Sequence, residues 1–343
     1  MPSGRIKTGK VTMQDIADKL KITKVSVSKA LNNQKGISKE LRHKVIALAQ
    51  EMGYARGAQE SVCRFAFIVS KHFFLETDAF YSEIYYYFNK FCIQDGHDAT
   101  LIIVNNADEQ QDRLPAQLQK EVFHGIAVAG EMPDHYLKAL AGLRIPMVLM
   151  DFESEILGQC AILTDNYYWG YRVTDYLAQR GHRRIGFVGP IGSTESITDR
   201  FFGYRRALLM NGLPYEERWT LVNNDTSSGL YRSMIDLPAQ MPTAFVCHCD
   251  MAAHYLIGTM AAKGIRCPQD VSVISFDDTK LAETTQPKLT SVSIDLRSFA
   301  RKGIDTLCAM RQGEKELLTR IYLPAELRER DSVLPCPDGQ AAL

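Results

Sequence analysis

One short segment near the N-terminus carries side chains that suit contact with DNA. Residues 24–32, KVSVSKALN, read as a helix whose outward positions lack the Glu/Lys pairs of an ordinary surface helix. Those outward positions hold small, hydroxyl, amide and basic side chains: Lys24, Val25, Ser26, Ser28, Lys29 and Asn32. Hydroxyl and amide groups bind phosphate oxygens, and a long basic side chain can donate to guanine. We therefore predict that this helix enters a groove of DNA.

A second set of side chains suits a small hydroxylated ligand. Arg donates two parallel hydrogen bonds, carboxylates accept from vicinal hydroxyls, and aromatic rings stack on the apolar faces of sugars. Side chains of these kinds follow strand-like runs or stand near helix starts: Phe80, Tyr81, Asp151, Phe152, Arg200, Asp250 and Asp277. For Asp250, Asp165 and Asp278, capping a helix or pairing across the molecule is an equally good interpretation.

Local signals predict three short helices at the N-terminus. Thr12 followed by Asp15 forms a capping box, and Thr23 begins a second helix after a tight break. Ser38 caps a third helix over residues 39–52. Three helices with a tight turn between the first two form a helix-turn-helix domain. A three-helix protein-binding module is the alternative, but its outer face would be apolar rather than small and basic.

About forty residues between positions 11 and 54 resemble the DNA-binding head of the lactose/galactose repressor family. The resemblance rests on VTMQDIADKLKITKVSVSKALN (11–32) and GISKELRHKVIALAQEMGY (36–54). It implies that Lys24, Val25 and Lys29 stand at base-reading positions. The positions that it implies for phosphate contacts are Thr12, Thr23, Ser26, Ser28, Asn32, Ser38 and Tyr54. Residues 55–63, ARGAQESVC, form the expected hinge but lack the Leu that family members wedge between base steps.

From residue 64 onward, strand-like runs alternate with helical segments. The predicted strands are 65–70, 99–104, 125–130, 146–151, 184–189, 243–248 and 271–276, and the clearest connecting helices are 78–94, 168–180 and 199–211. This α/β pattern predicts doubly wound parallel sheets with both faces covered. It is too long for one sheet, so we expect two lobes that divide near residues 163–165.

The body is similar to the same family's effector-binding core, which is akin to periplasmic sugar-binding proteins. The matching segments are TDNYYWGYRVTDYLAQRGHRRIGFVGP (164–190), RFFGYRRAL (200–208) and DVSVISFDDTKLAETTQPKLTSV (270–292). The resemblance implies three crossings between the lobes. We expect lobe 1 to hold about 64–163 and 291–322, lobe 2 about 164–290 and 323–335, and a loose tail to follow over 336–343.

The resemblance also implies which residues contact the effector. They are Phe80, Tyr81, Asp151, Phe152, Arg200 and Asp277. Cys249-Asp250 stands where members commonly have Asn-Asp, so these two residues join the candidate site with altered chemistry. A sugar is the expected effector. Nearby aromatic residues, Phe73, Phe74 and Tyr85–Tyr87, fit a sugar site, the core or a dimer interface equally well.

Charge and cysteine placement limit the partners. The net charge is zero, yet residues 1–64 hold 13 Lys/Arg and five Asp/Glu, so a basic head precedes an acidic body. The N-terminal MPSGRIKTGK has no apolar core of a signal peptide, and no stretch is long enough to span a membrane. The eight cysteines are scattered without a CxxC pair. We expect a cytoplasmic protein with no metal site, cofactor or membrane partner.

The resulting hypothesis is a transcriptional regulator, in the first place a repressor, controlled by a small ligand between the lobes. A homodimer would read a pseudo-palindromic operator on double-stranded DNA, because its two-fold axis imposes that symmetry. An enzyme is the first alternative, but GPIGS (189–193) lacks the Gly-Lys-Ser/Thr of a phosphate loop and no G-x-S-x-G elbow is present. A solute-binding protein, the second alternative, would not need the basic head. Induction and co-repression both remain open.

Overall fold

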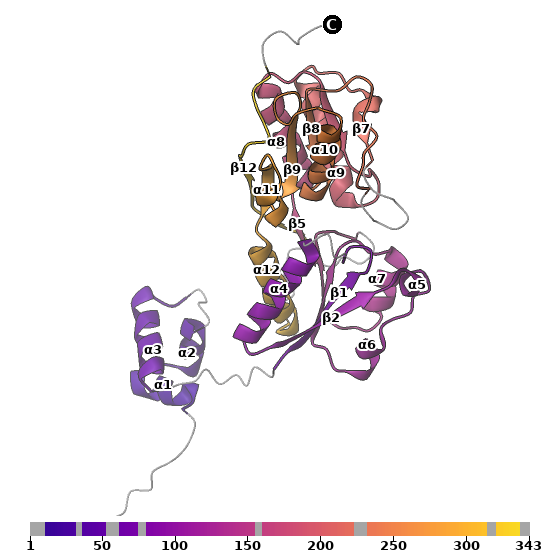
Figure 1. The fold of residues 1–343 in the computed structure, drawn as a ribbon. Coiled ribbons are helices and arrows are strands. Elements are labelled where there is room, and N and C mark those ends of the chain that lie inside the picture. Colours follow the sequence, from indigo (N-terminus) through magenta and orange to yellow (C-terminus); the bar gives the residue numbers. More distant parts are fainter. Residues whose placement is uncertain are drawn as a thin grey trace, which may run out of the picture. The chain divides into compact units, whose positions relative to one another are not determined.

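The computed structural model describes residues 11–31, 36–52, 62–74, 80–154, 160–222, 232–313 and 320–336. The chain divides into two compact units, a head that ends at Val62 and a body that begins at Cys63. Figure 1 shows the helical head in indigo and the two lobes of the body in magenta to yellow. The expected hinge residues 55–61 and the tail residues 337–343 lie outside the described residues.

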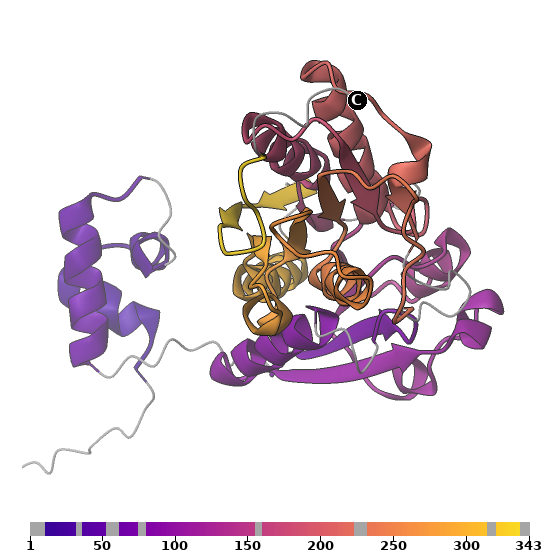
Figure 2. The ribbon, with the colours of Figure 1, turned by 45° about the horizontal axis from the view of Figure 1, so that its top comes forward.

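The head is a three-helix bundle, as the sequence predicted (Figure 2). Its helices are α1 (Met13–Leu20), α2 (Lys24–Leu31) and α3 (Lys39–Glu51). Apolar residues at helical spacing meet in one small core: Ile16, Ala17, Val27, Ala30, Val45 and Ala49. Burial of these side chains orients the opposite face of α2 toward solvent.

The helix starts in the head are capped at the predicted residues. The Asp15 amide donates to the Thr12 hydroxyl and the Thr12 amide donates to the Asp15 carboxylate, at 3.3 and 2.7 Å, which completes a capping box. The amide of Ser26 donates to Thr23 Oγ1 at 3.1 Å. Lys21 ends α1 in the left-handed conformation, with a φ of 52°, and so makes the tight turn before α2.

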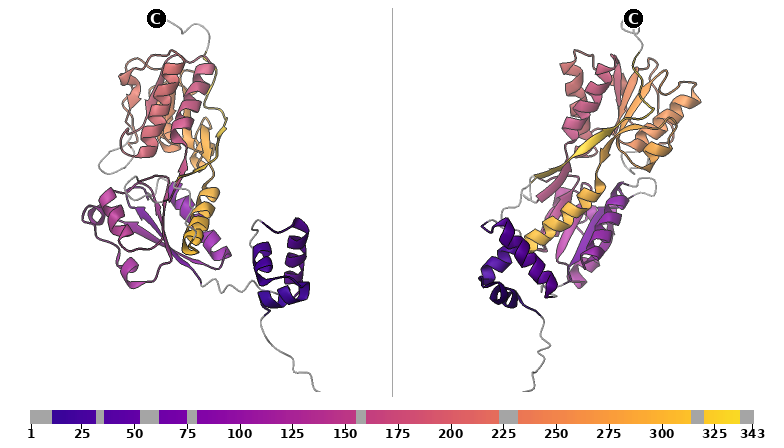
Figure 3. Two further views of the ribbon diagram at one scale, coloured as in Figure 1. Left: turned by 180° about the vertical axis from the view of Figure 1, so that it is seen from behind. Right: turned by 90° about the vertical axis from the view of Figure 1, so that its left-hand side faces the viewer.

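The body consists of two six-stranded sheets, each covered by helices on both faces (Figure 3). The sheet of lobe 1 is parallel and has the order β11-β5-β4-β3-β1-β2. Its strands are β1 (Arg64–Ser70), β2 (Asp98–Val104), β3 (Gly125–Ala129), β4 (Met147–Met150), β5 (Cys160–Thr164) and β11 (Arg320–Leu323). The predicted doubly wound architecture is confirmed.

The sheet of lobe 2 repeats this arrangement in the order β12-β10-β9-β8-β6-β7. Its strands are β6 (Ile185–Val188), β7 (Thr220–Leu221), β8 (Ala244–Cys247), β9 (Ser272–Asp277), β10 (Thr290–Ile294) and β12 (Ala325–Arg328). All pairings are parallel except that β12 runs antiparallel to β10 at the edge. In both lobes the loops that follow the parallel strands lie together at the C-terminal edge of the sheet, which is where such sheets bind ligands.

Two layers of helices cover each sheet. In lobe 1, α4 (Phe80–Gln94) and α12 (Leu296–Arg311) pack on one face, whereas α6 (Ala116–Lys120) and α7 (Asp134–Ala141) pack on the other, and α5 (Asn106–Gln110) follows β2. In lobe 2, α8 (Asn166–Gln179) and α9 (Glu195–Met210) face α10 (Asp250–Ala262) and α11 (Lys280–Thr284) across the sheet, and a 3-10 turn, η1 (Glu217–Trp219), precedes β7.

The chain crosses between the lobes three times, and one crossing corrects the sequence prediction. We expected the return to lobe 1 after residue 290, but β10 over Thr290–Ile294 belongs to the sheet of lobe 2. The crossing therefore falls at Asp295, which caps α12. The cause is that β10 alternates polar and apolar residues and pairs with β9, so Val292 is fully buried in the core of lobe 2.

Helices α8 and α9 approach so closely that two glycines are required. A Cβ atom built on Gly170 would lie 2.2 Å from the Arg200 carbonyl oxygen, and one on Gly203 would lie 2.1 Å from the Tyr167 carbonyl oxygen. These distances are shorter than any that a real Cβ atom shows. Both neighbours are backbone atoms, so they cannot move aside as a flexible side chain could. The glycine pair thus fixes the position of α9, which carries Arg200.

We predict that Gly170→Ala lowers the free energy of unfolding by about 1–3 kcal/mol, because the new methyl group overpacks the helix contact. Gly258→Ala is the matched control, since a Cβ there meets no atom within 4 Å. The control should raise the stability by roughly 0.5–1 kcal/mol through helix propensity alone. Urea unfolding followed by circular dichroism measures both, and equal effects of the two substitutions would contradict the close contact.

Candidate DNA-reading helix and ligand cleft

The outer face of α2 presents the side chains that the sequence assigned to base reading. Val27 and Ala30 are buried against α1 and α3, which leaves Lys24, Val25 and Lys29 exposed. Val25 is 63% exposed, so its methyl groups are accessible on the outer face of α2. A methyl-bearing side chain between two lysines on one helix face fits a groove that offers thymine methyls and guanine acceptors.

The predicted phosphate-contacting residues around α2 stand mainly at helix starts. Thr12, Thr23 and Ser38 each accept a hydrogen bond from the first turn of α1, α2 or α3. Ser26 and Ser28 are half-buried beside them on α2. Helix N-termini carry a partial positive charge, and the first turn of α2 contains no acidic residue to oppose a phosphate. Asn32 and Tyr54 lie outside the described residues.

In the body, Arg200 of α9 is buried at the C-terminal edge of the lobe 2 sheet. Only 4% of it is exposed, and its guanidinium lies over the ring of Phe276, 4.4 Å from the centroid. Its Nε donates to Asn166 Oδ1 at 2.8 Å and its Nη1 donates to the backbone carbonyl of His248. These bonds join the N-terminus of α8, the end of β8 and the end of β9 around one cation.

The third nitrogen of Arg200 faces a carboxylate at the edge of the sheet. Arg200 Nη2 lies 3.3 Å from Asp277 Oδ1, the longest of the three guanidinium contacts. Asp277 ends β9 with a φ of 94°, a conformation that strains a residue other than glycine. Strain held at the C-terminal end of a strand is typical of ligand sites, so the pair is the best candidate on this lobe.

Burial and the charge of Arg200 together keep the neighbouring His248 neutral. Burial, followed by the nearby guanidinium, lowers the pKa of His248 to about 3. His248 is therefore neutral at physiological pH, so no second positive charge repels the Arg200 guanidinium. Its Nδ1 lies 3.3 Å from the Val188 carbonyl, so its imidazole links the ends of β8 and β6.

On lobe 1 the structure brings Tyr81 and Asp151 together. The Tyr81 hydroxyl donates to Asp151 Oδ2 at 2.9 Å, although 70 residues separate them in the sequence. Asp151 follows β4 with a φ of 71°, and the ring of Phe73 lies 5.8 Å from that of Tyr81. A phenol, a carboxylate and a second aromatic ring thus stand at the C-terminal edge of this sheet.

Four predicted effector residues are placed mainly in the scaffold. Phe80 and Phe152 belong to the two cores of lobe 1 and are 6% and 2% exposed. Cys249 caps α10, where its sulfur accepts from the Ala252 amide at 3.4 Å. The thiol therefore fills the capping position that Asn commonly holds.

Asp250 is enclosed behind the cleft. Its carboxylate accepts from Ser275 and Ser291 at 2.7 Å each, and from both the amide and the hydroxyl of Thr279. Burial outweighs these bonds and raises its pKa to about 6. These contacts support a scaffold role for Asp250, which the sequence left open. Its carboxylate holds the loop after β9 in place through Thr279.

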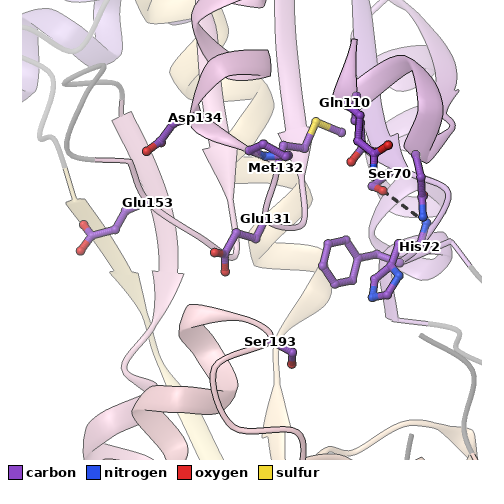
Figure 4. A pocket seen from close by; sticks show the side chains of 12 residues that line it. Ser70, His72, Gln110, Glu131, Met132, Asp134, Glu153 and Ser193 are labelled. Atoms are coloured by element: carbon purple, nitrogen blue, oxygen red, sulfur yellow. Dashed lines mark hydrogen bonds between the residues drawn. The ribbon is translucent and has the colours of Figure 1, made fainter. Parts of the chain in front are cut away.

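A cavity of about 460 Å³ opens over the C-terminal ends of β1–β4 (Figure 4). Its wall comes mainly from lobe 1, including Ser70, His72, Phe73 and Glu131, and Ser193 of lobe 2 stands on the far side. Glu131 reaches the other lobe, since its Oε2 accepts from the Glu195 amide, the first of α9, at 2.7 Å. The cavity is therefore part of the cleft between the lobes.

The sequence missed most residues of this cavity. Glu109, Glu131 and Glu153 were not singled out, because single acids in polar segments resemble ordinary surface positions. Glu131 and Glu153 do follow β3 and β4 within three residues, so the rule that named Asp151 could have found them. Glu109 lies in α5, a five-residue helix too short to give a periodic signal.

Comparison with known proteins identifies both parts of the chain. The profile described as "Bacterial regulatory proteins, lacI family" matches residues 12–56, and the one described as "Periplasmic binding protein-like domain" matches residues 174–333. The chain belongs to the lacI family. Its helix-turn-helix head and two-lobed body, predicted from the sequence, are the two parts of that architecture.

Individual lacI-family relatives match over nearly the whole chain. The HTH-type transcriptional repressor PurR of Vibrio cholerae serotype O1 (strain M66-2) is 28% identical over 332 residues, which cover 94% of this chain and 98% of that protein. Among solved structures, the transcriptional regulator CelR–cellobiose complex has a TM-score of 0.68 at 22% identity and covers 94% and 99% of the two chains. The lac repressor dimer bound to operator and the anti-inducer ONPF has a TM-score of 0.67 at 21% identity, with 95% and 100% covered.

The lacI-family assignment agrees with the remaining structural observations. Its similar proteins are transcriptional repressors rather than enzymes. In the described part of the chain, no helix is both long and apolar enough to cross a membrane. The same residues contain no group of three or more His, Cys, Asp or Glu side chains that could hold a metal ion.

Proposed function

We propose that this lacI-family repressor reads a pseudo-palindromic operator through α2 and that a sugar bound between its lobes controls its hold on DNA. The observation that carries the proposal is the combination in one chain of an exposed Lys-Val-Lys face on α2 with a polar cleft at the C-terminal edges of two sheets. Binding of the ligand changes operator affinity only if the two lobe arrangements bind it unequally.

The reading residues on α2 are Lys24, Val25 and Lys29. Lys29 and Lys24 donate to guanine acceptors, and Val25 contacts a thymine methyl. Thr12, Thr23 and Ser38, with Ser26 and Ser28, position the head on phosphates and carry no base preference. Two heads in a homodimer would read two half-sites, and the similar lac repressor was solved as a dimer bound to operator. Because the proposed operator is chromosomal DNA, we propose that the protein acts in the cytoplasm.

A sugar fits the cleft because carboxylates and aromatic rings stand at the C-terminal edges of the two sheets. Asp277 and Asp151 offer carboxylate oxygens, Tyr81 and Phe73 offer rings, and Arg200 supplies a buried guanidinium at the end of β9. CelR, which has the same fold, was solved as a complex with cellobiose. In this proposal Asp250, Cys249, Phe80 and Phe152 support the site from behind rather than contact the sugar.

We predict that Lys29→Ala relaxes base discrimination at one operator position by about 1–3 kcal/mol, because a bidentate contact to guanine is lost. Binding-site selection followed by a gel-shift salt series measures this. Lys44→Ala is the control, since it removes the same charge from the exposed face of α3. An unchanged sequence preference in Lys29→Ala would remove Lys29 from the reading face, and binding indifferent to sequence would reject the operator proposal.

We predict that Arg200→Ala abolishes the effect of the ligand on operator affinity, while the separately folded head still binds the operator. Loss of the guanidinium releases Asn166, His248 and Asp277 at once, so the cleft loses its shape as well as a donor. Fluorescence anisotropy on labelled operator, with and without ligand, gives the readout. A normal ligand response in this variant would show that Arg200 does not belong to the site.

A further inference from the structure

The cavity over β1–β4 is lined by four carboxylic acids that follow three different strands. Glu109 follows β2, Glu131 and Asp134 follow β3, and Glu153 follows β4. Figure 4 shows Glu131, Asp134 and Glu153 along one side of the cavity and Ser193 of lobe 2 opposite. Neither Lys nor Arg occurs among the described lining residues.

Three of these acids already have protein partners. Glu131 accepts from the Glu195 amide at 2.7 Å, and Asp134 Oδ1 accepts from the Ser154 hydroxyl at 3.1 Å. Glu153 forms an ion pair with Arg320. These contacts hold the rim of the cavity in place.

Glu109 differs from the other three. Only 8% of its surface is exposed, and its Oε1 has no hydrogen-bond partner. Burial raises the pKa of this carboxyl, while a side-chain hydrogen bond with Ser70 and the charges of His72 and His135 act in the opposite direction, so Oε1 is the oxygen left without a donor. A buried acceptor without a donor costs free energy, and the cost is relieved when a bound molecule supplies the donor. Glu109 therefore points to a ligand that brings hydrogen-bond donors into this cavity.

The rest of the lining agrees with such a ligand. Ser70, Asn106 and Gln110 can both donate and accept, and Phe73 and Met132 offer apolar surface. This mixture suits a ring that has hydroxyls around its edge and an apolar face. It does not suit an anion, because phosphate or carboxylate would meet four acids and no buried cation.

We propose that this cavity is a second subsite, which binds a further hydrogen-bond-donating sugar unit of the effector. The proposed function assigns the first unit to Arg200 and Asp277. A second unit in this cavity makes the effector a di- or trisaccharide, neutral or amino-substituted, and not a monosaccharide, sugar phosphate, sugar acid or purine. This inference rests on the proposed function, because it takes the cleft as the effector site. It adds the length and the charge class of the ligand.

Native mass spectrometry of the full chain tests the length and charge class directly. The protein is mixed with equal concentrations of neutral mono-, di- and trisaccharides, amino disaccharides, sugar phosphates, sugar acids and purine bases. The expected adduct has the mass of a di- or trisaccharide, and its mass separates the neutral from the amino form. A monosaccharide, anionic or purine adduct, or no adduct at all, overturns the proposal.

Calorimetry on variants then locates the second unit. Glu109→Gln is expected to weaken binding of the selected oligosaccharide about tenfold, because it replaces a charged acceptor by a neutral amide. Gln110→Ala is a second variant in the same lining, and it is also expected to weaken binding. Because Gln110 is exposed, this variant should fold and so provides the test if Glu109→Gln does not fold. The matched control is Asp98→Asn, which removes an exposed charge at the opposite, N-terminal end of β2.

The two proposals fail in different ways. If the selected oligosaccharide binds equally well to Glu109→Gln, Gln110→Ala and Asp98→Asn, the second subsite is rejected while effector control of the operator stands. If the oligosaccharide binds as expected but leaves operator affinity unchanged, the regulatory proposal fails and the subsite stands. A weakening of about tenfold in Asp98→Asn as well would trace the effect to net charge and reject the specific role of Glu109.

Discussion

The ligand side of this protein depends on one buried cation, the guanidinium of Arg200. A charge in such a site is tolerated only when it is paired and hydrogen-bonded. Arg200 donates to Asn166 of α8 and to the carbonyl of His248 after β8, and it forms an ion pair with Asp277 at the end of β9. Gly170 and Gly203 are needed because α9 must approach α8 closely enough to bring Arg200 there. The packing of α8 against α9 therefore determines where the guanidinium of Arg200 lies in the cleft.

The two lobes meet through polar contacts that a ligand can rearrange. Glu131 of lobe 1 accepts from the first amide of α9, and the Glu153 amide donates to Glu195 at 3.4 Å. Burial, with Glu153, Asp199 and Glu131 nearby, raises the pKa of Glu195. Such contacts are weak compared with the apolar cores inside each lobe, so the lobes are the parts that can shift. Because α9 also carries Arg200, a change in these contacts at the start of α9 would alter the position of Arg200.

The head was predictable from sequence because its signals are local. Thr12, Asp15 and Thr23 cap helices within three residues of themselves, and the apolar spacing of Ile16 and Val27 fixes which face is buried. The long central strands followed from continuous apolar runs. The edge strands β7, β11 and β12 did not, since two to four residues that alternate in burial leave no such run.

The candidate cleft was only partly predictable. Sequence named both Asp250 and Asp277, but it could not tell that Asp250 turns into a ring of hydroxyls while Asp277 meets Arg200. That difference depends on contacts between residues far apart in the chain. Glu109 escaped notice for the same reason, since only the fold encloses its carboxylate.

The central claim is that a ligand in the cleft and an operator on the head affect each other's binding. Linkage requires reciprocity: the factor by which the ligand changes operator affinity must equal the factor by which operator changes ligand affinity. Operator titrations at saturating ligand, and calorimetric ligand titrations with and without operator, measure both factors on the same protein. The account predicts equal factors, on the order of 5- to 150-fold. A ligand that binds the cleft tightly while both factors equal one would contradict it.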